Sequence, residues 1–369
     1  MTQKWFQGKD IGCRQDKNAH IVDGTMTLTS IHNLVASGIP KATGVELDGM
    51  DTFRRGDQAK EVISTNRDAQ LPDIVSWNGG LTVMVNEHVT AYSRNPIQRI
   101  DFGRFGDTLE TRAVTYDAWF HMFGPGEHIV YIVLGFPVQV LSADNAQAHR
   151  DETSAWLMGE HPFTVNSQPC TVTVKAIRFV AQPVGAFCEF VLDNNGSFVR
   201  EAEMARAEIA VLDQGYNTLD LFVLQNGQVS NYYTTGDNLG MRQAARNLMQ
   251  MVQDMHGRKL SPIEADEMII RHANHPTDPI EITANGQGVH ITQLVSTAVE
   301  SATGAVIDYV NGVWGDGGQF RYLLLTGGGC LVMGDALKRH LKNAILLPDP
   351  ITANARGLAK MAQRKGVFK

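Results

Sequence analysis

Short apolar runs alternate along the chain with segments in which apolar residues recur every three or four positions. The runs at 128–140, 171–180 and 321–326 predict buried strands, the last running into glycines, and 108–123 has the spacing of a helix with one apolar face. Further helices are expected at 239–255, with Asn238 as its cap, and at 264–271, 292–310, 333–342 and 353–365, the last capped by Thr352. Strands that alternate with helices predict an α/β protein.

A strand–turn–strand pattern at 211–229 has an unusual bend. The sequence VLDQGYNTLDLFVLQNGQV places Asp213, Gly215, Thr218 and Asp220 at or beside one turn between two apolar arms. Asp10-Ile-Gly12, near the start of the chain, repeats the Asp-x-Gly pattern. Two such bends suggest a duplicated domain, and we expect the bends to face each other across a cleft.

The residues at these bends suit a nucleoside triphosphate. Phosphates need closely approaching backbone N–H groups, which glycine permits, as well as a cation and a magnesium ion held by carboxylates. A polar group that orients the attacking water completes the set. The candidates are Asp10 and Asp213 as magnesium ligands through water, Gly12 and the Gly215–Thr218 bend for phosphate, Lys17 for the β-phosphate, Gln182 for water, and Gly327, Gly328 and Gly329 for the adenosine end. Singly, each has an ordinary structural explanation, because Asp-x-Gly is usually a plain turn; their joint order is what favours the nucleotide hypothesis.

Composition narrows the class of protein. The 369 residues carry a formal net charge of −7, which argues against direct nucleic-acid binding through a basic surface. The four cysteines are scattered without a CxxC pair, as is typical of a reduced, cytoplasmic protein. The N-terminus lacks the apolar core of a signal peptide, and the most apolar stretch, 128–141, is interrupted by Gly135 and Pro137 and is too short to span a bilayer. No membrane association is therefore expected.

The order of these motifs resembles that of the actin-like ATPase superfamily. DIGCRQDK is similar to its first phosphate motif, LDQGYNTLD to its second, and LLLTGGGCLVMGDALKRHL to its adenosine motif. The stretches VASGIP, VLGFPV, VAQPVGA and LPDPITANARGLAKM resemble bacterial plasmid-segregation actins (ParM type) and related archaeal and phage proteins. The resemblance covers nearly the whole chain.

The resemblance implies an actin-like fold, in which two RNase-H-like domains flank a nucleotide cleft and each carries a smaller subdomain. Domain I is expected at 1–206 plus 346–369, with a subdomain insertion at roughly 20–100, and domain II at 207–345. The implied cofactors are ATP and Mg²⁺. The implied site comprises Asp10, Asp213 and Gln182 for catalysis, with the two aspartates also at the metal, and Gly12, Lys17, Gly215, Tyr216, Asn217, Thr218, Gly327, Gly328 and Gly329 for the nucleotide.

The implied function is an ATPase that polymerises into filaments for plasmid segregation or a cytoskeletal role, with itself and a DNA-bound adaptor protein as partners. A sugar-type kinase of the same superfamily is one alternative, although no aspartate base is identifiable. A nucleotide-binding scaffold with weak catalysis is another, because Asp16 and Arg14 depart from the usual first motif. A carboxylate about 4 Å from a phosphate charge costs about 1 kcal/mol in water.

Overall fold

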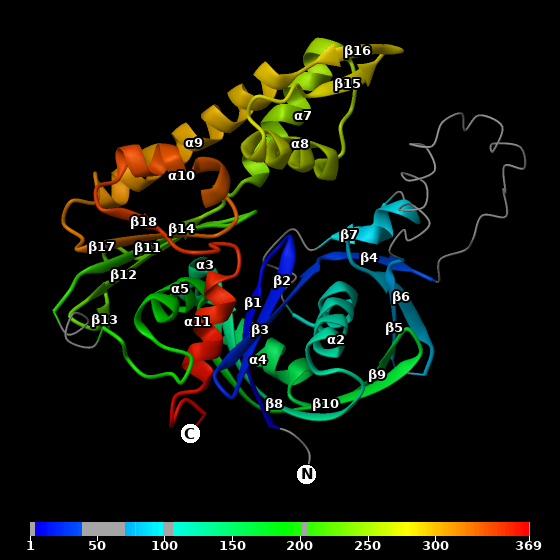
Figure 1. Ribbon diagram of the computed structural model, residues 1–369, viewed down its shortest axis with the longest axis vertical. Helices are drawn as coiled ribbons and strands as arrows, with labels where there is room; N and C mark the ends of the chain where they lie inside the picture. Colours follow the sequence, from blue (N-terminus) through cyan, green and yellow to red (C-terminus); the bar gives the residue numbers. More distant parts are fainter. Residues whose placement is uncertain are drawn as a thin grey trace, which may run out of the picture.

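The fold was analysed in a computed structural model that describes residues 4–38, 71–77, 79–93, 95–98, 106–200 and 206–368. Within this part of the chain, two sheets form separate lobes (Figure 1). The middle of the expected insertion at 20–100, residues 39–70, lies outside the described residues together with the end of VASGIP. In the described ranges, no helix is both long enough and apolar enough to cross a membrane.

The larger sheet has ten strands in the order β3-β2-β1-β8-β10-β9-β5-β6-β4-β7. Their bounds are β1 Lys4–Ile11, β2 Gln15–Val22, β3 Thr25–His32, β4 Leu34–Ser37, β5 Asp73–Trp77, β6 Leu81–Val85, β7 Ile97–Gln98, β8 Gly126–Phe136, β9 Gly159–Val165 and β10 Gln168–Ala181. The sheet curls around helix α2 (Leu109–Phe123), which contacts strands from β2 to β9 (Figure 1). Trp119 and Tyr116 of α2 belong to the apolar core between helix and sheet.

Three more helical segments accompany this sheet, namely η2 Glu87–Ala91, α3 Val138–Ser142 and α4 Ala146–Leu157. The strand predicted at 128–140 is shorter than expected: β8 stops at Phe136, and α3 starts directly after Pro137. Proline has no N–H for a sheet ladder, but it is tolerated at the start of a helix, which explains the early stop. The helix predicted at 108–123 is confirmed, with the Thr108 side chain accepting a hydrogen bond from the Thr111 N–H.

The second lobe is built on a six-stranded sheet. Its strands are β11 Ile209–Gln214, β12 Leu219–Gln225, β13 Gln228–Val229, β14 Thr235–Asp237, β17 Tyr322–Thr326 and β18 Ala344–Leu346. The helices are α7 Arg242–His256, α8 Pro262–Asn274, α9 Thr292–Trp314 and α10 Cys330–His340, with a separate hairpin of β15 Glu281–Ala284 and β16 Gln287–His290. Alternate residues of β11 serve two cores: Ala210 and Leu212 pack with α7–α10, whereas Ile209 and Val211 pack with α5 (Gln182–Val191).

The predicted hairpin at 211–229 and the glycine-terminated strand before α10 are therefore confirmed. The helix expected at 239–255 is wrong at its start, because α7 begins at Arg242 and its N-cap is Met241 rather than Asn238. Residues before Arg242 instead extend the turn of the hairpin: the Met241 N–H donates to the Gly215 carbonyl at 3.1 Å. This bond fixes the start of α7 against the second bend.

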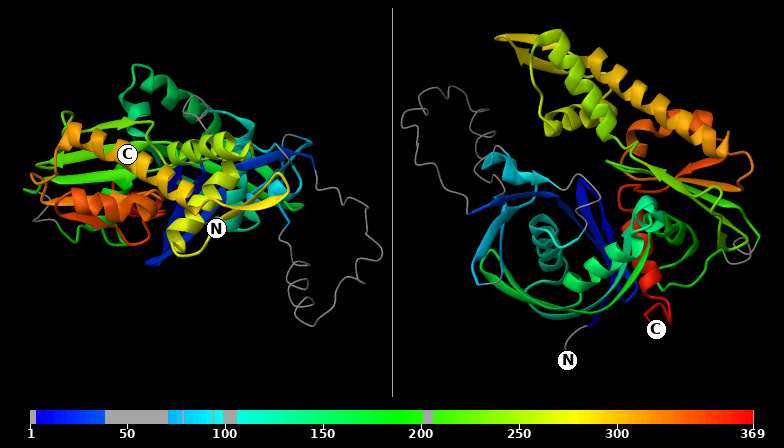
Figure 2. Two further views of the ribbon diagram at one scale, coloured as in Figure 1. Left: turned by 90° about the horizontal axis from the view of Figure 1, so that it is seen from above. Right: turned by 180° about the vertical axis from the view of Figure 1, so that it is seen from behind.

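Two helices cross where the lobes meet (Figure 2). Helix α5 (Gln182–Val191) follows β10 directly, and α11 (Ala353–Ala362), the last helix, packs against both α5 and β1. The crossing is closed by glycines, because a Cβ on Gly357 would overlap the carbonyl oxygen of Gly185 and a Cβ on Gly8 would overlap the backbone of α11. Backbone-to-backbone packing thereby fixes the N-terminal ends of both helices, which point into the same cavity.

Candidate functional site

A cavity of about 300 Å³ lies between the two lobes. Strand ends, helix starts and turns from both sheets line it. All the site residues expected from the sequence are among its lining residues: Asp10, Gly12, Lys17, Gln182, Asp213, Gly215, Tyr216, Asn217, Thr218, Gly327, Gly328 and Gly329. The two Asp-x-Gly bends therefore face each other, as the sequence predicted.

The first bend joins β1 to β2. The Gly12 N–H donates to the Gln15 carbonyl at 3.1 Å and closes the turn. Asp10 and Lys17 are register partners across the hairpin, and Lys17 Nζ lies 3.0 Å from Asp10 Oδ2. Burial alone would lower the pKa of Lys17, but Asp10 and Asp213 together raise it, so that this lysine stays charged at the cavity floor.

Gln182 is the first residue of α5 and is buried. Its Nε2 donates to Asp10 Oδ1 at 2.8 Å and to the Ile11 carbonyl at 3.1 Å. Pro183 follows it in the first turn, where the missing N–H costs nothing. The helix start therefore holds the Gln182 amide against Asp10, on the same side of the cavity as Lys17.

The second bend joins β11 to β12, and its turn is closed by the Gly215 N–H donating to the Thr218 carbonyl at 2.8 Å. Asp213 is the register partner of Asp220 and the penultimate residue of β11. Burial, with the nearby charge of Asp10 as a second cause, raises the pKa of Asp213 to about 6. Two buried carboxylates facing one cavity repel each other, and a divalent cation between them would relieve that repulsion. The donor set at the bends thus fits magnesium.

Asn354 is a site residue that the sequence prediction missed. It belongs to α11, lines the cavity, and donates through Nδ2 to Asp213 Oδ2 at 2.6 Å. Its Oδ1 accepts from the Ala186 N–H of α5 at 3.1 Å. Asn354 therefore links Asp213 of one lobe to the α5–α11 crossing. It lies in the quoted stretch LPDPITANARGLAKM, but no local motif marks it as a partner of Asp213.

The three glycines form the end of the cavity nearest β17 and α10. Gly327 has φ +85°, and a Cβ there would overlap the Gln214 carbonyl and the Asp213 carboxylate, so only glycine fits. The Gly329 N–H donates to the Gln214 carbonyl at 2.8 Å. Across the cavity, α8 contributes a partly apolar wall made of Ile269, Ile270, Ala273 and Asn274. This end of the cavity differs from the charged region around Asp10, Lys17 and Asp213, because it offers backbone and apolar surface.

Asp16 does not reach the cavity. Side chains alternate across a strand, so Asp16 points away from the face that carries Lys17. Asp16 Oδ2 lies 2.6 Å from Lys9 Nζ, and both side chains are completely buried. Asn18 and Gln7 extend this polar row, with Gln7 Nε2 donating to Asn18 Oδ1 at 2.7 Å. The row explains why the strand before Asp10 is polar although it is buried.

Arg14 also has a defined partner. It reaches across the cavity and forms an ion pair with Asp266 of α8 in the other lobe. Both residues line the cavity. Arg14 thus connects the first bend to the apolar wall that α8 forms. It does not lie with Asp10 and Lys17, where a phosphate-binding group is expected.

A family model described as archaeal actin homologue MreB-like, C-terminal, matches residues 211–339. This range runs from the second bend through the three glycines to the end of α10. Among curated proteins, none matches the chain by sequence.

Solved structures resemble the chain over almost its whole length. A 15-stranded ParM filament from Clostridium botulinum is 18% identical, with 98% of this chain and 99% of that chain covered and a TM-score of 0.72. The archaeal actin homologue Ta0583 is 15% identical, with coverages of 97% and 99% and a TM-score of 0.71. Bacillus thuringiensis ParM with ATP is 14% identical, with coverages of 96% and 97% and a TM-score of 0.64. These likenesses confirm the expected actin-like fold and the resemblance to ParM and archaeal actin homologues.

Proposed function

We propose, from the premise that this chain has the actin-like fold, that it binds Mg-ATP in the cavity between its lobes, hydrolyses it, and polymerises into filaments. One observation carries the proposal. The hairpin bends of two different sheets place Asp10 and Asp213 around one cavity, together with every other residue singled out by its chemistry. Solved relatives with ATP and with ADP support the choice of nucleotide.

In this proposal the two bends grip the phosphates. The turn at Gly12 and the turn from Gly215 to Thr218, with Tyr216 and Asn217 between them, line the cavity from opposite lobes and would supply backbone N–H groups to the phosphates. Lys17, now 3.0 Å from Asp10, supplies the cation for the β-phosphate. Asp10 and Asp213 would hold magnesium through water, and the ion would neutralise phosphate charge.

Gln182 is the proposed water-positioning residue. Its Nε2 is anchored to Asp10 and to the Ile11 carbonyl, which fixes the plane of the amide. The Oε1 atom of the same amide would accept a hydrogen bond from the attacking water and keep it in line with the γ-phosphate. Asn354 serves as a positioning residue, because its hydrogen bond keeps Asp213 aimed at the cavity.

The adenosine end is assigned to Gly327, Gly328 and Gly329. All three glycines line the cavity and would offer backbone surface to a nucleoside, and the side chains of Ile269 and Ile270 in the same lining would offer an apolar surface. A flat base between a glycine turn and an apolar helix face is well accommodated. Phosphates at one end and base at the other would span both lobes.

Nucleotide contacts from both lobes give ATP a means of controlling assembly. A γ-phosphate held by both bends favours the closed arrangement, and its release favours opening, so that filament contacts would depend on the nucleotide state. The solved ParM filament supports the polymerisation proposal. We further propose the division into domain I (1–206 with 346–369) and domain II (207–345), a cytoplasmic location, and a plasmid-segregation or cytoskeletal role through a DNA-bound adaptor protein.

The test is sedimentation with electron microscopy of the purified protein, with and without Mg-ATP, alongside phosphate release. We expect pelleted filaments and phosphate release with ATP only. Gln182→Ala should slow phosphate release and leave assembly intact. Neither polymer nor phosphate release over a wide range of protein concentrations would refute the proposal, and ATP turnover that requires an added sugar would favour the kinase alternative. The scaffold alternative loses part of its motivation, because Asp16 is paired with Lys9 away from the cavity.

A further inference from the structure

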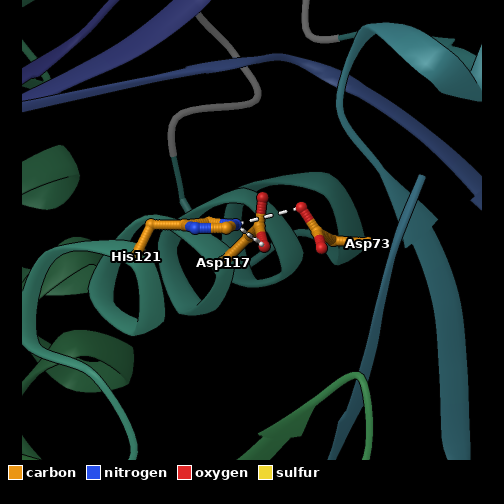
Figure 3. A group of neighbouring side chains, drawn as sticks. All are labelled: Asp73, Asp117 and His121. Atoms are coloured by element: carbon orange, nitrogen blue, oxygen red, sulfur yellow. Dashed lines mark hydrogen bonds and ion pairs between the residues drawn. The ribbon is translucent and has the colours of Figure 1, made fainter. Parts of the chain in front are cut away.

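A second group of chemically active side chains lies outside the cavity described above. Asp73 is the first residue of β5, and Asp117 and His121 lie one helical turn apart on α2, where α2 faces β5 (Figure 3). None of the three lines the nucleotide cavity. The three side chains converge from two elements, and one ligand atom from each lies within 4.8 Å of the others.

The spacing of these atoms suits a small cation. His121 Nε2 lies 3.0 Å from Asp73 Oδ2 and 3.5 Å from Asp117 Oδ1. Ligand atoms bound at about 2.1 Å in a tetrahedral site are about 3.4 Å apart. Small side-chain rotations would therefore bring the three atoms to metal-binding distances without a change in the backbone.

Asp117 supplies an independent observation. Its side chain is completely buried, and among the described residues neither carboxylate oxygen has a hydrogen-bond partner; its contact with His121 is an ion pair at 3.5 Å. Burial raises the pKa of Asp117 to about 6. A buried carboxylate without hydrogen bonds is costly, and a metal ion in front of it would remove that cost. Asp117 is aimed at the point where Asp73 and His121 meet (Figure 3).

The surroundings of Asp73 resemble the second layer of a metal site. Asn166 Nδ2 donates to Asp73 Oδ1 at 2.6 Å, and Asn86 Nδ2 donates to Asp73 Oδ2 at 3.1 Å. Such outer hydrogen bonds orient the carboxylate ligands of metals and tune their affinity. Asp73 is therefore held in place by two amides, whereas His121 at the rim is 43% exposed and leaves an approach from solvent.

We propose that Asp73, Asp117 and His121 bind a divalent first-row transition metal ion, with Zn²⁺ as the best fit, through one carboxylate oxygen from each aspartate and Nε2 of the histidine. One imidazole and two carboxylates form a known kind of zinc ligand set, and a water molecule completes the tetrahedron. The ion would join β5 to α2 and so fasten the outer strands of the curled sheet to the helix at its centre.

A proton is the competing occupant. The adjacent carboxylates of Asp117 and Asp73 raise the pKa of His121 to about 10, so that the protonated ring bridges the two carboxylates when no metal is bound. The protonated cluster has a formal charge of −1, and Glu87 of η2 adds a further negative charge nearby. Zn²⁺ with a neutral imidazole brings the cluster to zero. The ion must displace the Nε2 proton, as is usual for histidine ligands.

The experiment is calorimetric titration of Zn²⁺ into chelator-treated, nucleotide-free protein, followed by Co²⁺ absorption spectra as a report on coordination geometry. We expect one Zn²⁺ per chain at this cluster and a tetrahedral Co²⁺ spectrum. His121→Ala should weaken that binding at least tenfold. Asp117→Asn keeps the side-chain shape and should also weaken Zn²⁺ binding at least tenfold. With two variants, a folding defect in one does not decide the outcome, and circular dichroism shows whether each variant is folded.

Two matched variants locate the binding. His290→Ala removes a histidine whose Nδ1 lies 4.0 Å from Glu281 on an exposed hairpin, and it should leave Zn²⁺ binding unchanged. Asp213→Ala removes a carboxylate of the nucleotide cavity and should also leave it unchanged, which separates this proposal from the proposed ATP site. Equal Zn²⁺ affinity in wild type, His121→Ala and Asp117→Asn would overturn the proposal, as would an absence of binding in the wild type.

Discussion

Asp16 of the first bend could either face the bound phosphates or pair with Lys9 in the interior. Removing the charge of Asp16 distinguishes these two arrangements. If Asp16 faced the phosphates, Asp16→Asn would remove about 1 kcal/mol of repulsion and tighten ATP binding about fivefold. In the structure Asp16 instead pairs with Lys9 at 2.6 Å, and both side chains are fully buried. Asp16→Asn would then leave a buried ammonium without its counter-charge, which costs about 3–5 kcal/mol.

The expected result is a large loss of stability with no gain in ATP affinity. For a lobe of this size, about 3–5 kcal/mol corresponds to a drop of roughly 6–20 °C in Tm. Differential scanning calorimetry measures the drop. The double variant Lys9→Met with Asp16→Asn should be more stable than either single variant, because no unpaired charge remains buried.

A surface pair is the matched control. Lys342 and Asp316 also lie 2.6 Å apart, but their side chains are 70% and 52% exposed. Asp316→Asn should leave the Tm within experimental error, because solvent screens exposed ion pairs. A Tm for Asp16→Asn as high as the wild type, together with tighter ATP binding, would refute the buried-pair account and return Asp16 to the phosphate site.

Three further predictions concern the α5–α11 crossing and Asp213. Gly357→Ala should destabilise the protein by about 1–3 kcal/mol in thermal melts, because the new methyl group overlaps the Gly185 carbonyl. The control is Gly304→Ala on α9, which has open space around it and should instead stabilise the protein by about 0.5–1 kcal/mol. Equal effects of the two substitutions would contradict tight packing between α5 and α11. Mg²⁺-dependent nucleotide affinity should fall as the pH drops through about 6, because protonation of Asp213 removes a negative charge. Asn354→Ala removes a hydrogen bond that lowers the Asp213 pKa, so a binding titration should show the fall at higher pH; an unchanged midpoint would count against that contact.

The bends were predictable because their chemistry is local. Asp-x-Gly turns and a glycine run between a strand and a helix appear within a few residues of sequence, and the structure places all of them around one cavity. Gly327 is a clear case, since its φ of +85° and its contact with Gln214 admit no side chain. The roles assigned to these residues remain proposals.

The missed features depend on contacts between distant segments. Asn354 meets Asp213 only because the last helix returns to the lobe junction, and Asp73 meets Asp117 only because β5 faces α2. The Lys9–Asp16 pair could have been anticipated: if Lys17 points into the cleft, strand alternation turns Asp16 to the other face, towards Lys9 on the neighbouring arm.

The central claim is that the two facing bends form one magnesium–nucleotide site. Equilibrium binding of a fluorescent ATP analogue to wild type and to Asp213→Ala, each with Mg²⁺ and with chelator, measures this most directly. We expect wild type to bind the analogue with Mg²⁺, ATP to displace it, and Asp213→Ala to lose the Mg²⁺-dependent part. Equal binding by the two proteins, or binding by neither, would contradict the account.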